Sequence, residues 1–251
     1  MLEILFFITA LIYAVIGFGG GSTYNALLVL GNTDYQLIPI ISLICNILVV
    51  SGGVWHFYRG GHIQIMRIAP WIIFSIPASF VGGIISVPEI IFTGVLGCSL
   101  LLSGIRLLWP EKEDQFFTSI KVLQHRFMTA ILGALLGLLA GITGIGGGIF
   151  LAPILHFMRW GNAKQIAGAC ALFILVNSLA GLTGQSLKIE GANLFPVLFP
   201  YWVLLPAVII GGQIGSWLGT TQIKKWIIKK MTGVLVIYVS VRLIIKFIGL
   251  L

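Results

Sequence analysis

The sequence of 251 residues has little charge, because Asp, Glu, Lys and Arg together make up only 9% of it. A soluble domain carries about 25% charged residues. Apolar residues make up 58% of the chain and form long runs, several of them near the ~20 residues that span a bilayer. This composition excludes an ordinary soluble protein and predicts an integral membrane protein.

Cysteine and histidine are also scarce, and their spacing excludes the common metal and redox motifs. The 3 cysteines stand alone within apolar runs, and the 4 histidines form no HxxxH pair. We therefore expect no metal site and no cofactor, and we expect packing roles for Cys45, Cys98 and Cys170. No nucleotide-binding motif is present, so the sequence does not support direct coupling to ATP.

The charges that are present are mainly basic, and they give the chain a formal net charge of +8. Most of them lie between the apolar runs, where Lys and Arg set topology and contact anionic lipid headgroups. An anionic substrate is a second interpretation of the same excess. No basic arm with interleaved aromatic residues is present, so we expect membrane lipids, and not nucleic acid, as a partner.

One polar stretch divides the apolar segments into two groups of four. It predicts a first membrane repeat over residues 1–109, a linker over 110–125 and a second membrane repeat over 126–251. Asn162 and Gln165 form a capping box that predicts a helix start. The predicted segments cover residues 1–30, 36–57, 68–86, 88–109, 126–158, 163–184, 195–219 and 230–250.

A glycine cluster occurs once in each half. Residues 17–21 read Gly-Phe-Gly-Gly-Gly, and residues 144–148 read Gly-Ile-Gly-Gly-Gly. Glycine lacks a Cβ and orders at a high entropic cost, so such clusters interrupt helices. A duplicated break in an apolar chain is typical of transporters with two repeats. Further landmarks repeat in order, namely Asn46 and Asn177, Pro77 and Pro206, Gly82-Gly83 and Gly211-Gly212, and Arg106 and Arg242.

The two segments with glycine breaks are too long for single spans. As one straight helix, residues 126–158 would be about 50 Å long, against a hydrocarbon core of about 30 Å. If both segments are re-entrant, nearly all Lys and Arg fall on one side, as the positive-inside rule expects. The predicted fold is an all-α integral membrane protein with two inverted repeats. Each repeat is a glycine-broken, re-entrant helical hairpin plus three transmembrane helices.

Re-entrant tips would expose backbone N–H groups at the starts of short helices, which carry about half a positive charge. Two such tips meeting near the midplane would form a cradle for an anion. The alternative for the glycines is close helix packing, and the alternative for Asn46 and Asn177 is hydrogen bonding between helices. The expected substrate-binding residues are Gly19, Gly20, Gly21, Ser22, Thr23, Asn46, Thr143, Gly146, Gly147, Gly148 and Asn177.

These motifs resemble the sulfite exporter TauE/SafE family over nearly the whole chain. The specific elements are residues 17–21, residues 141–148, Pro153 and the helix that carries Asn177. The resemblance implies a multi-pass protein of the cell membrane that moves small sulfur-containing anions, such as sulfite, thiosulfate, sulfoacetate or related sulfonates. Ala26 occupies the place that Pro153 has in the second half, which predicts a different shape for the first tip.

We therefore expect a secondary transporter, and not an enzyme, whose glycine breaks hold a small sulfur oxyanion or sulfonate at the midplane. An anion channel with the same site is the alternative. An intramembrane sulfur-transfer enzyme would need an activated nucleophile, and neither Cys45 nor Cys170 has a spaced His or Asp to activate it.

Overall fold

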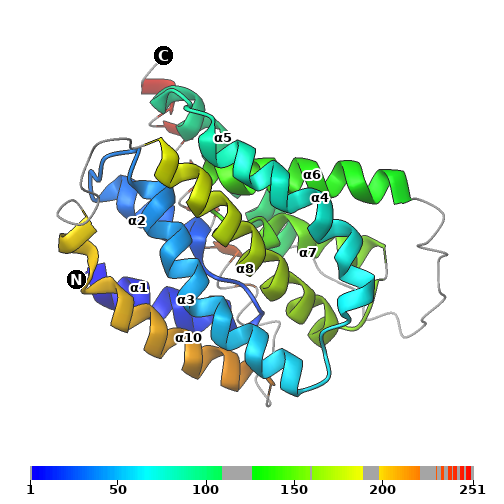
Figure 1. The fold of residues 1–251 in the computed structure, drawn as a ribbon. Coiled ribbons are helices and arrows are strands. Elements are labelled where there is room, and N and C mark those ends of the chain that lie inside the picture. Colours follow the sequence, from blue (N-terminus) through cyan, green and yellow to red (C-terminus); the bar gives the residue numbers. More distant parts are fainter. Residues whose placement is uncertain are drawn as a thin grey trace.

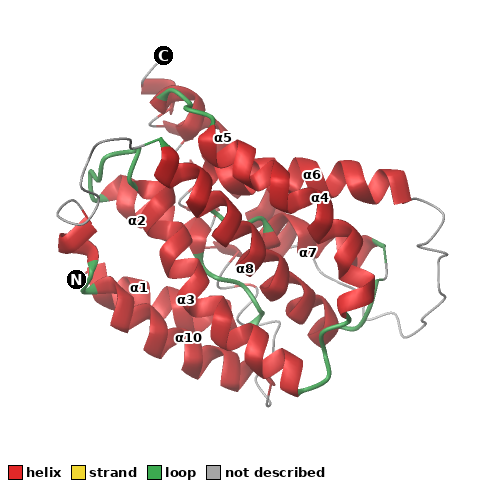
Figure 2. Cartoon of the chain, in the orientation of Figure 1, coloured by secondary structure: helices red, strands yellow, loops and turns green. Residues whose placement is uncertain are grey.

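The computed structural model describes residues 2–108, 126–158, 160–188 and 198–220, together with scattered positions between 230 and 249. Over these residues every regular element is a helix and none is a strand (Figures 1 and 2). The predicted linker over 110–125 and part of the last predicted segment, over 230–250, lie outside the described residues. The predicted all-helical class is confirmed for the part that is described.

Each half opens with two helices that are separated at its glycine cluster. These are α1 (Leu2–Val15) and α2 (Gly21–Leu30) in the first half, and α6 (Arg126–Thr143) and α7 (Gly148–Phe157) in the second. The remaining helices are α3 (Ile38–Arg59), α4 (Ile65–Ile84), α5 (Glu89–Leu108), α8 (Ala163–Leu187) and α10 (Leu204–Thr220), with a short 3-10 helix η2 (Phe199–Tyr201) before α10. The helices are thus interrupted where the glycine clusters predicted.

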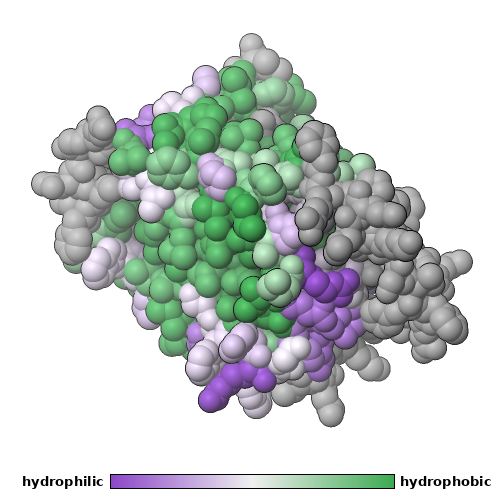
Figure 3. Space-filling model, turned by 45° about the vertical axis from the view of Figure 1, so that its right-hand side comes forward, coloured by the Kyte–Doolittle hydropathy of each residue, from purple (hydrophilic) through white to green (hydrophobic). Residues whose placement is uncertain are grey.

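Four helical stretches of the described chain are long and apolar enough to cross a bilayer. They are α3, α4, α8 and the stretch Phe199–Gly219 that contains α10, while α1 and most of α6 are shorter apolar helices. Figure 3 shows a broad apolar face on the outside of the molecule. Large apolar side chains such as Met66, Ile73 and Ile210 are exposed, as contact with lipid requires. The chain is a multi-pass membrane protein.

The helices α4 and α10 each pack against the opposite half of the chain. Helix α4 lies along α6 and α8, and α10 lies along α1 and α3 (Figure 1). A Cβ on Gly82 of α4 would collide with the Leu138 carbonyl of α6, and a Cβ on Gly211 of α10 would meet the Phe7 carbonyl of α1. Gly82 and Gly211 are matched landmarks of the sequence repeat, so the same feature makes the equivalent contact in both halves.

Glycines at every fourth residue bring these helices into backbone contact, which is a common way to pack helices in membranes. Gly133, Gly137 and Gly141 of α6 lie in turn against Trp71, Ser75 and Ser79 of α4. Gly211, Gly215 and Gly219 of α10 lie in turn against Phe7, Leu11 and Val15 of α1. Because both numbers rise together in each series, α4 is parallel to α6 and α10 is parallel to α1.

The central helices α3 and α8 run in opposite directions. Gly53 of α3 lies near Ala171 of α8, and Phe57 of α3 lies near Gly168 of α8, so one number rises as the other falls. Figure 1 shows the two helices crossing the molecule side by side. Helix α8 begins with the predicted capping box, in which the Gln165 N–H donates to Asn162 Oδ1 at 2.9 Å.

Both glycine breaks lie in the interior, because residues 17–26 and 143–149 are all buried. The ring of Tyr24 in α2 stacks on Phe6 in α1 with 4.6 Å between the ring centroids. This contact folds α2 back along α1, so the start of α1 and the end of α2 lie on the same side of Figure 1. The breaks are therefore held at the centre of the helix bundle.

Candidate functional site

The two glycine breaks meet around the side chain of Asn46, which α3 carries and which is 0% exposed. A Cβ on Gly19 or on Gly21 would collide with the Asn46 carboxamide. A Cβ on Gly146 of the other break would come within 3.3 Å of Asn46 Nδ2. Of the expected site residues, the structure thus gathers Gly19, Gly21, Gly146 and Asn46 in one place.

The remaining glycines of the breaks contact other neighbours. A Cβ on Gly20 would come within 3.0 Å of the Tyr24 ring and of Thr9, and a Cβ on Gly147 would come within 2.9 Å of Phe173. A Cβ on Gly148 would collide with Ile174. At these three positions the atoms nearest to an added Cβ belong to residues other than Asn46.

Most of these glycines have a backbone that side chains rarely allow. The left-handed positions are Gly17 (φ 80°) and Gly20 (φ 92°) in the first break, and Gly144 (φ 72°), Gly146 (φ 83°) and Gly147 (φ 78°) in the second. Gly19 does not share this conformation, although its partner in the repeat, Gly146, does. At position 19, glycine is needed because a Cβ would collide with Asn46. At position 146, glycine is needed both because φ is positive and because a Cβ would collide with its neighbours.

The first turns of α2 and α7 leave backbone N–H groups unpaired. The first donors of α2 are Thr23 and Tyr24, both to the Gly20 carbonyl at 3.0 Å, and those of α7 are Phe150 and Leu151, both to the Gly147 carbonyl at 3.1 Å. The N–H groups of residues 19–22 and 146–149 make no hydrogen bond within the described chain. Buried, unpaired donors at the positive ends of two helices are a favourable place for an anion.

Two asparagines of the first half hold the second break. Asn25 Nδ2 donates to the Thr143 carbonyl at 2.5 Å, and Asn46 Nδ2 donates to the carbonyls of Gly144 at 3.3 Å and Ile145 at 3.1 Å. The Oδ1 atoms of both asparagines are buried and have no hydrogen-bond partner in the described structure. The donors of Asn46 are thus used within the protein, and its oxygen is the atom left free.

Helix α8 brings Asn177 and Ser178 to the same region. Asn177 Nδ2 donates to the Phe173 carbonyl of its own helix at 2.8 Å. Ser178 is the neighbour of the second break, because a Cβ on Gly146 would come within 2.9 Å of Ser178 Oγ. Asn177 Oδ1 and Ser178 Oγ are both buried without a hydrogen-bond partner in the described structure.

The hydroxyl groups that were expected to add donors are engaged elsewhere. Thr23 Oγ1 and the Tyr13 hydroxyl lie 2.8 Å apart, and Ser22 Oγ donates to the same hydroxyl at 3.2 Å. Thr143 Oγ1 donates to the Leu139 carbonyl at 2.6 Å. These residues brace the breaks. Among the described residues, the unpaired hydroxyls beside the glycine tips are Ser178 Oγ, next to Gly146, and the Tyr24 hydroxyl, next to Gly20.

Ser178 and Tyr13 are missing from the sequence prediction, whereas the sequence does predict that Asn25, which follows the first glycine tip, faces the site. Asn25 had a usable signal, because a carboxamide four residues into a short apolar helix needs a partner in a membrane. No local pattern distinguished Ser178 or Tyr13 from other polar residues of apolar helices. Among the described residues no group of three or more His, Cys, Asp or Glu side chains comes together, and Cys45 and Cys170 are buried free cysteines.

Comparisons with known proteins assign the chain to a family. The family model of the sulfite exporter TauE/SafE matches residues 2–243. A probable membrane transporter protein of Sinorhizobium fredii, y4hK, is 32% identical over 244 residues, which cover 97% of each chain. A probable membrane transporter protein of Haemophilus influenzae is 27% identical over 213 residues, which cover 77% of this chain and 75% of that relative. No solved structure matches the chain. The chain therefore belongs to the TauE/SafE family of membrane transporters.

Proposed function

We propose that this transporter carries a small sulfur-containing anion, such as sulfite, thiosulfate, sulfoacetate or a related sulfonate, and binds it between the two glycine breaks. The supporting observation is that both breaks reach Asn46 and leave their buried N–H groups unpaired. An anion with several acceptor oxygens would satisfy donors from both halves at once. The name of the family is consistent with this class of substrate.

The site would bind the anion through dipoles, because none of the buried polar residues of the described chain is Lys or Arg. Each helix N-terminus offers about half a positive charge, and a hydrogen bond to a charged group contributes about 1.5–3 kcal/mol. Several such bonds offset the free-energy cost of desolvating the anion. Within the described residues, the site has no fixed counter-charge that would bind the anion too tightly for release. Binding strong enough to load and weak enough to release is what transport requires.

The unpaired oxygens of Asn25 and Asn46 favour a ligand that also carries a hydrogen-bond donor. A buried acceptor without a partner costs free energy, so a ligand that offers only acceptors leaves these two atoms unsatisfied. A protonated oxyanion such as hydrogen sulfite supplies both kinds of group. A bound water that accompanies the anion would serve the same purpose.

The repeats would be inverted, with a first repeat over residues 1–109, a linker over 110–125 and a second repeat over 126–251. The opposed directions of α3 and α8 support this arrangement, and so does the exchange of α4 and α10 between the halves. Arg59, Arg67 and Lys164 lie at one end of the bundle, where α3 ends and α4 and α8 begin (Figure 1). Alternating access would then come from rocking of the two repeats about the central site.

Counterflow of labelled anions tests the proposal. The full chain is purified, reconstituted into liposomes and offered 35S-labelled sulfite, thiosulfate and sulfoacetate, with sulfate and chloride as controls. We expect saturable uptake of at least one sulfur anion that is accelerated by the same anion on the opposite side. Unitary currents without counterflow would make the protein an anion channel, and uptake of none of these anions would refute the substrate class.

A further inference from the structure

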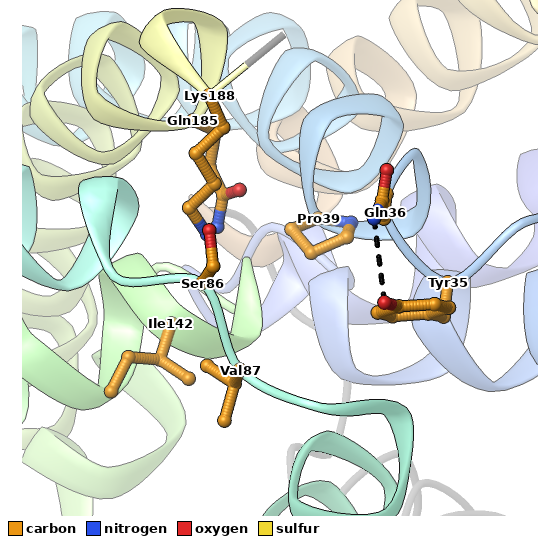
Figure 4. Close-up of a pocket in the computed structure, with 8 residues that line it drawn as sticks. All are labelled: Tyr35, Gln36, Pro39, Ser86, Val87, Ile142, Gln185 and Lys188. Carbon is orange, nitrogen blue, oxygen red and sulfur yellow. Dashed lines mark hydrogen bonds between the residues drawn. The ribbon is translucent and has the colours of Figure 1, made fainter.

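A pocket of about 90 Å³ lies at the end of the molecule where α3 begins and α8 ends (Figure 4). Both halves of the chain line it. Gln36 lies in the turn before α3 and Pro39 in the first turn of α3. Ser86 follows α4, Ile142 is in the last turn of α6, and Gln185 and Lys188 come from the end of α8. The central site does not include any of these residues.

The pocket adjoins the second glycine break. Pro39 and Ile142 line the pocket, and a Cβ on Gly144 would come within 2.8 Å of the Pro39 carbonyl oxygen. Gln185, which is 2% exposed, donates its Nε2 to the Gly141 carbonyl at 2.8 Å and so ties the end of α8 to α6. The contact between Pro39 and Gly144 therefore lies between a residue that lines the pocket and a residue whose carbonyl Asn46 holds.

Lys188 is the cation of this pocket. It is partly buried, and no ion pair joins it to a carboxylate among the described residues. Desolvation by burial lowers the pKa of Lys188, because burial disfavours the charged form of the amine. Figure 4 shows Lys188 and Gln185 extending from α8 toward Ser86, with Gln36 on the opposite wall. An anion in the pocket would supply a counter-charge to Lys188.

The cationic side chains at the opposite end of the molecule have different surroundings. The Arg59 guanidinium lies 4.8 Å from the centre of the Trp55 ring, and the Arg67 guanidinium lies 4.7 Å from the centre of the Trp160 ring. These arginines lie against aromatic rings, as residues at a membrane interface commonly do. Lys188 has no such ring contact in the described chain and lines a pocket.

We propose that this pocket is a vestibule through which the transported anion reaches and leaves the central site, and that Lys188 attracts the anion there. The vestibule opens on the face opposite the one that carries Arg59, Arg67 and Lys164, which is called the basic face below. The inference rests on the proposed function. The vestibule would become continuous with the site when Pro39 moves away from Gly144. Its ligand chemistry is an anionic oxygen, and the transported anion and a lipid phosphate are the two sources to be separated.

Transport from each face separately tests the role of Lys188. Right-side-out and everted vesicles from cells that express the full chain are given 35S-labelled sulfite, thiosulfate and sulfoacetate. With Lys188→Gln we expect KM for the transported anion to rise about 3- to 10-fold from the pocket face, because a local cation concentrates anions. Lys188→Glu should raise it further, and Lys188→Arg should restore it. KM from the basic face should stay at the wild-type value.

Lys164→Gln is the matched control, because Lys164 is also partly buried and lies at the opposite end. It should leave KM from the pocket face unchanged. The same variants are then reconstituted in phosphatidylcholine alone and with phosphatidylglycerol. A KM effect of Lys188→Gln that persists in phosphatidylcholine supports the vestibule, and an effect that requires phosphatidylglycerol assigns Lys188 to lipid headgroups and overturns it.

Two failures can be told apart. If the wild-type chain takes up none of the three anions, both the proposed function and the vestibule are refuted. If the wild type transports and Lys188→Gln keeps its KM from both faces, the vestibule alone is refuted. Equal increases of KM from both faces would also refute it, because they would show a general effect on the protein.

Discussion

At the scale of the residue, the carboxamide of Asn46 joins the two halves of the chain. Its nitrogen holds the second break through the carbonyls of Gly144 and Ile145, and its oxygen lies against Gly19 of the first break. The sequence predicted Asn46 as a donor to the anion. The structure places its donors on the protein, so its main contribution is to hold the breaks in position.

Replacement of Asn46 should weaken anion binding. In Asn46→Ala we expect affinity to fall by about 1–3 kcal/mol, because the second break loses two hydrogen bonds. Asn46→Asp should be worse, since a carboxylate would repel both the carbonyls and the anion. Calorimetric titration of the purified protein with sulfite measures both. Ser51→Ala is the control on the same helix, because exposed Ser51 bonds only its own helix at Ile47. Unchanged affinity in both Asn46 variants would remove Asn46 from the site.

A double-mutant experiment separates the two requirements for glycine in the breaks, namely the lack of space for a Cβ and the positive φ. Gly19→Ala should lower the melting temperature because its methyl group meets Asn46, and Asn46→Ala should relieve that loss. Gly146→Ala should stay destabilising in the Asn46→Ala background, because its φ of 83° and its contact with Ile174 remain. Thermal unfolding in detergent of the three single and the two double variants provides the readout. Equal relief of both glycine variants would contradict the distinction.

At the scale of the element, the sequence located the helices better than their partners. The breaks, the capping box at Asn162 and most helix bounds follow from local chemistry, and they were predictable. Helix α3 starts at Ile38, after a turn in which the Gln36 N–H donates to Asp34 Oδ1 at 3.0 Å. The contact of Asn25 with Thr143 spans 118 residues, and no local pattern encodes it. The supports of the site therefore came only from the structure.

The glycine contacts between α4 and α6 make a prediction at this scale. Gly137→Val should lower the melting temperature substantially, by an amount equivalent to about 1–3 kcal/mol, because its side chain would strike the Ser75 carbonyl. Leu135→Phe adds volume on the same helix at a side chain that is 52% exposed, so it should be tolerated. Fluorescence-monitored unfolding compares the two. A stable Gly137→Val protein would show that the helices are not in contact there.

At the scale of the whole molecule, the two ends of the bundle should face opposite sides of the membrane. In a background with the exposed Cys98 replaced by Ser, Gly61→Cys and Ala163→Cys should react with an impermeant maleimide from one side. Gln36→Cys, beside the pocket, should react from the other side. Intact cells and everted vesicles give the two readouts. Reaction of Gly61→Cys and Ala163→Cys from different sides would disprove the inverted arrangement.

The exchange of α4 and α10 between the halves also bears on biosynthesis. Within the described chain, the extensive contacts of α4 are all with helices of the second half, which the ribosome makes later. Helix α4 therefore enters the membrane before α6 and α8 have been made. Until then, the face of α4 that carries Gly82 must be exposed to lipid or bound by an insertion factor. Expressed alone, residues 1–117 should be degraded in a pulse-chase experiment, and co-expression of residues 118–251 should protect them. A stable isolated first half would mean that α4 finds another partner. In that sense each half acts as the folding template of the other, and the chain behaves as a dimer made from a single polypeptide.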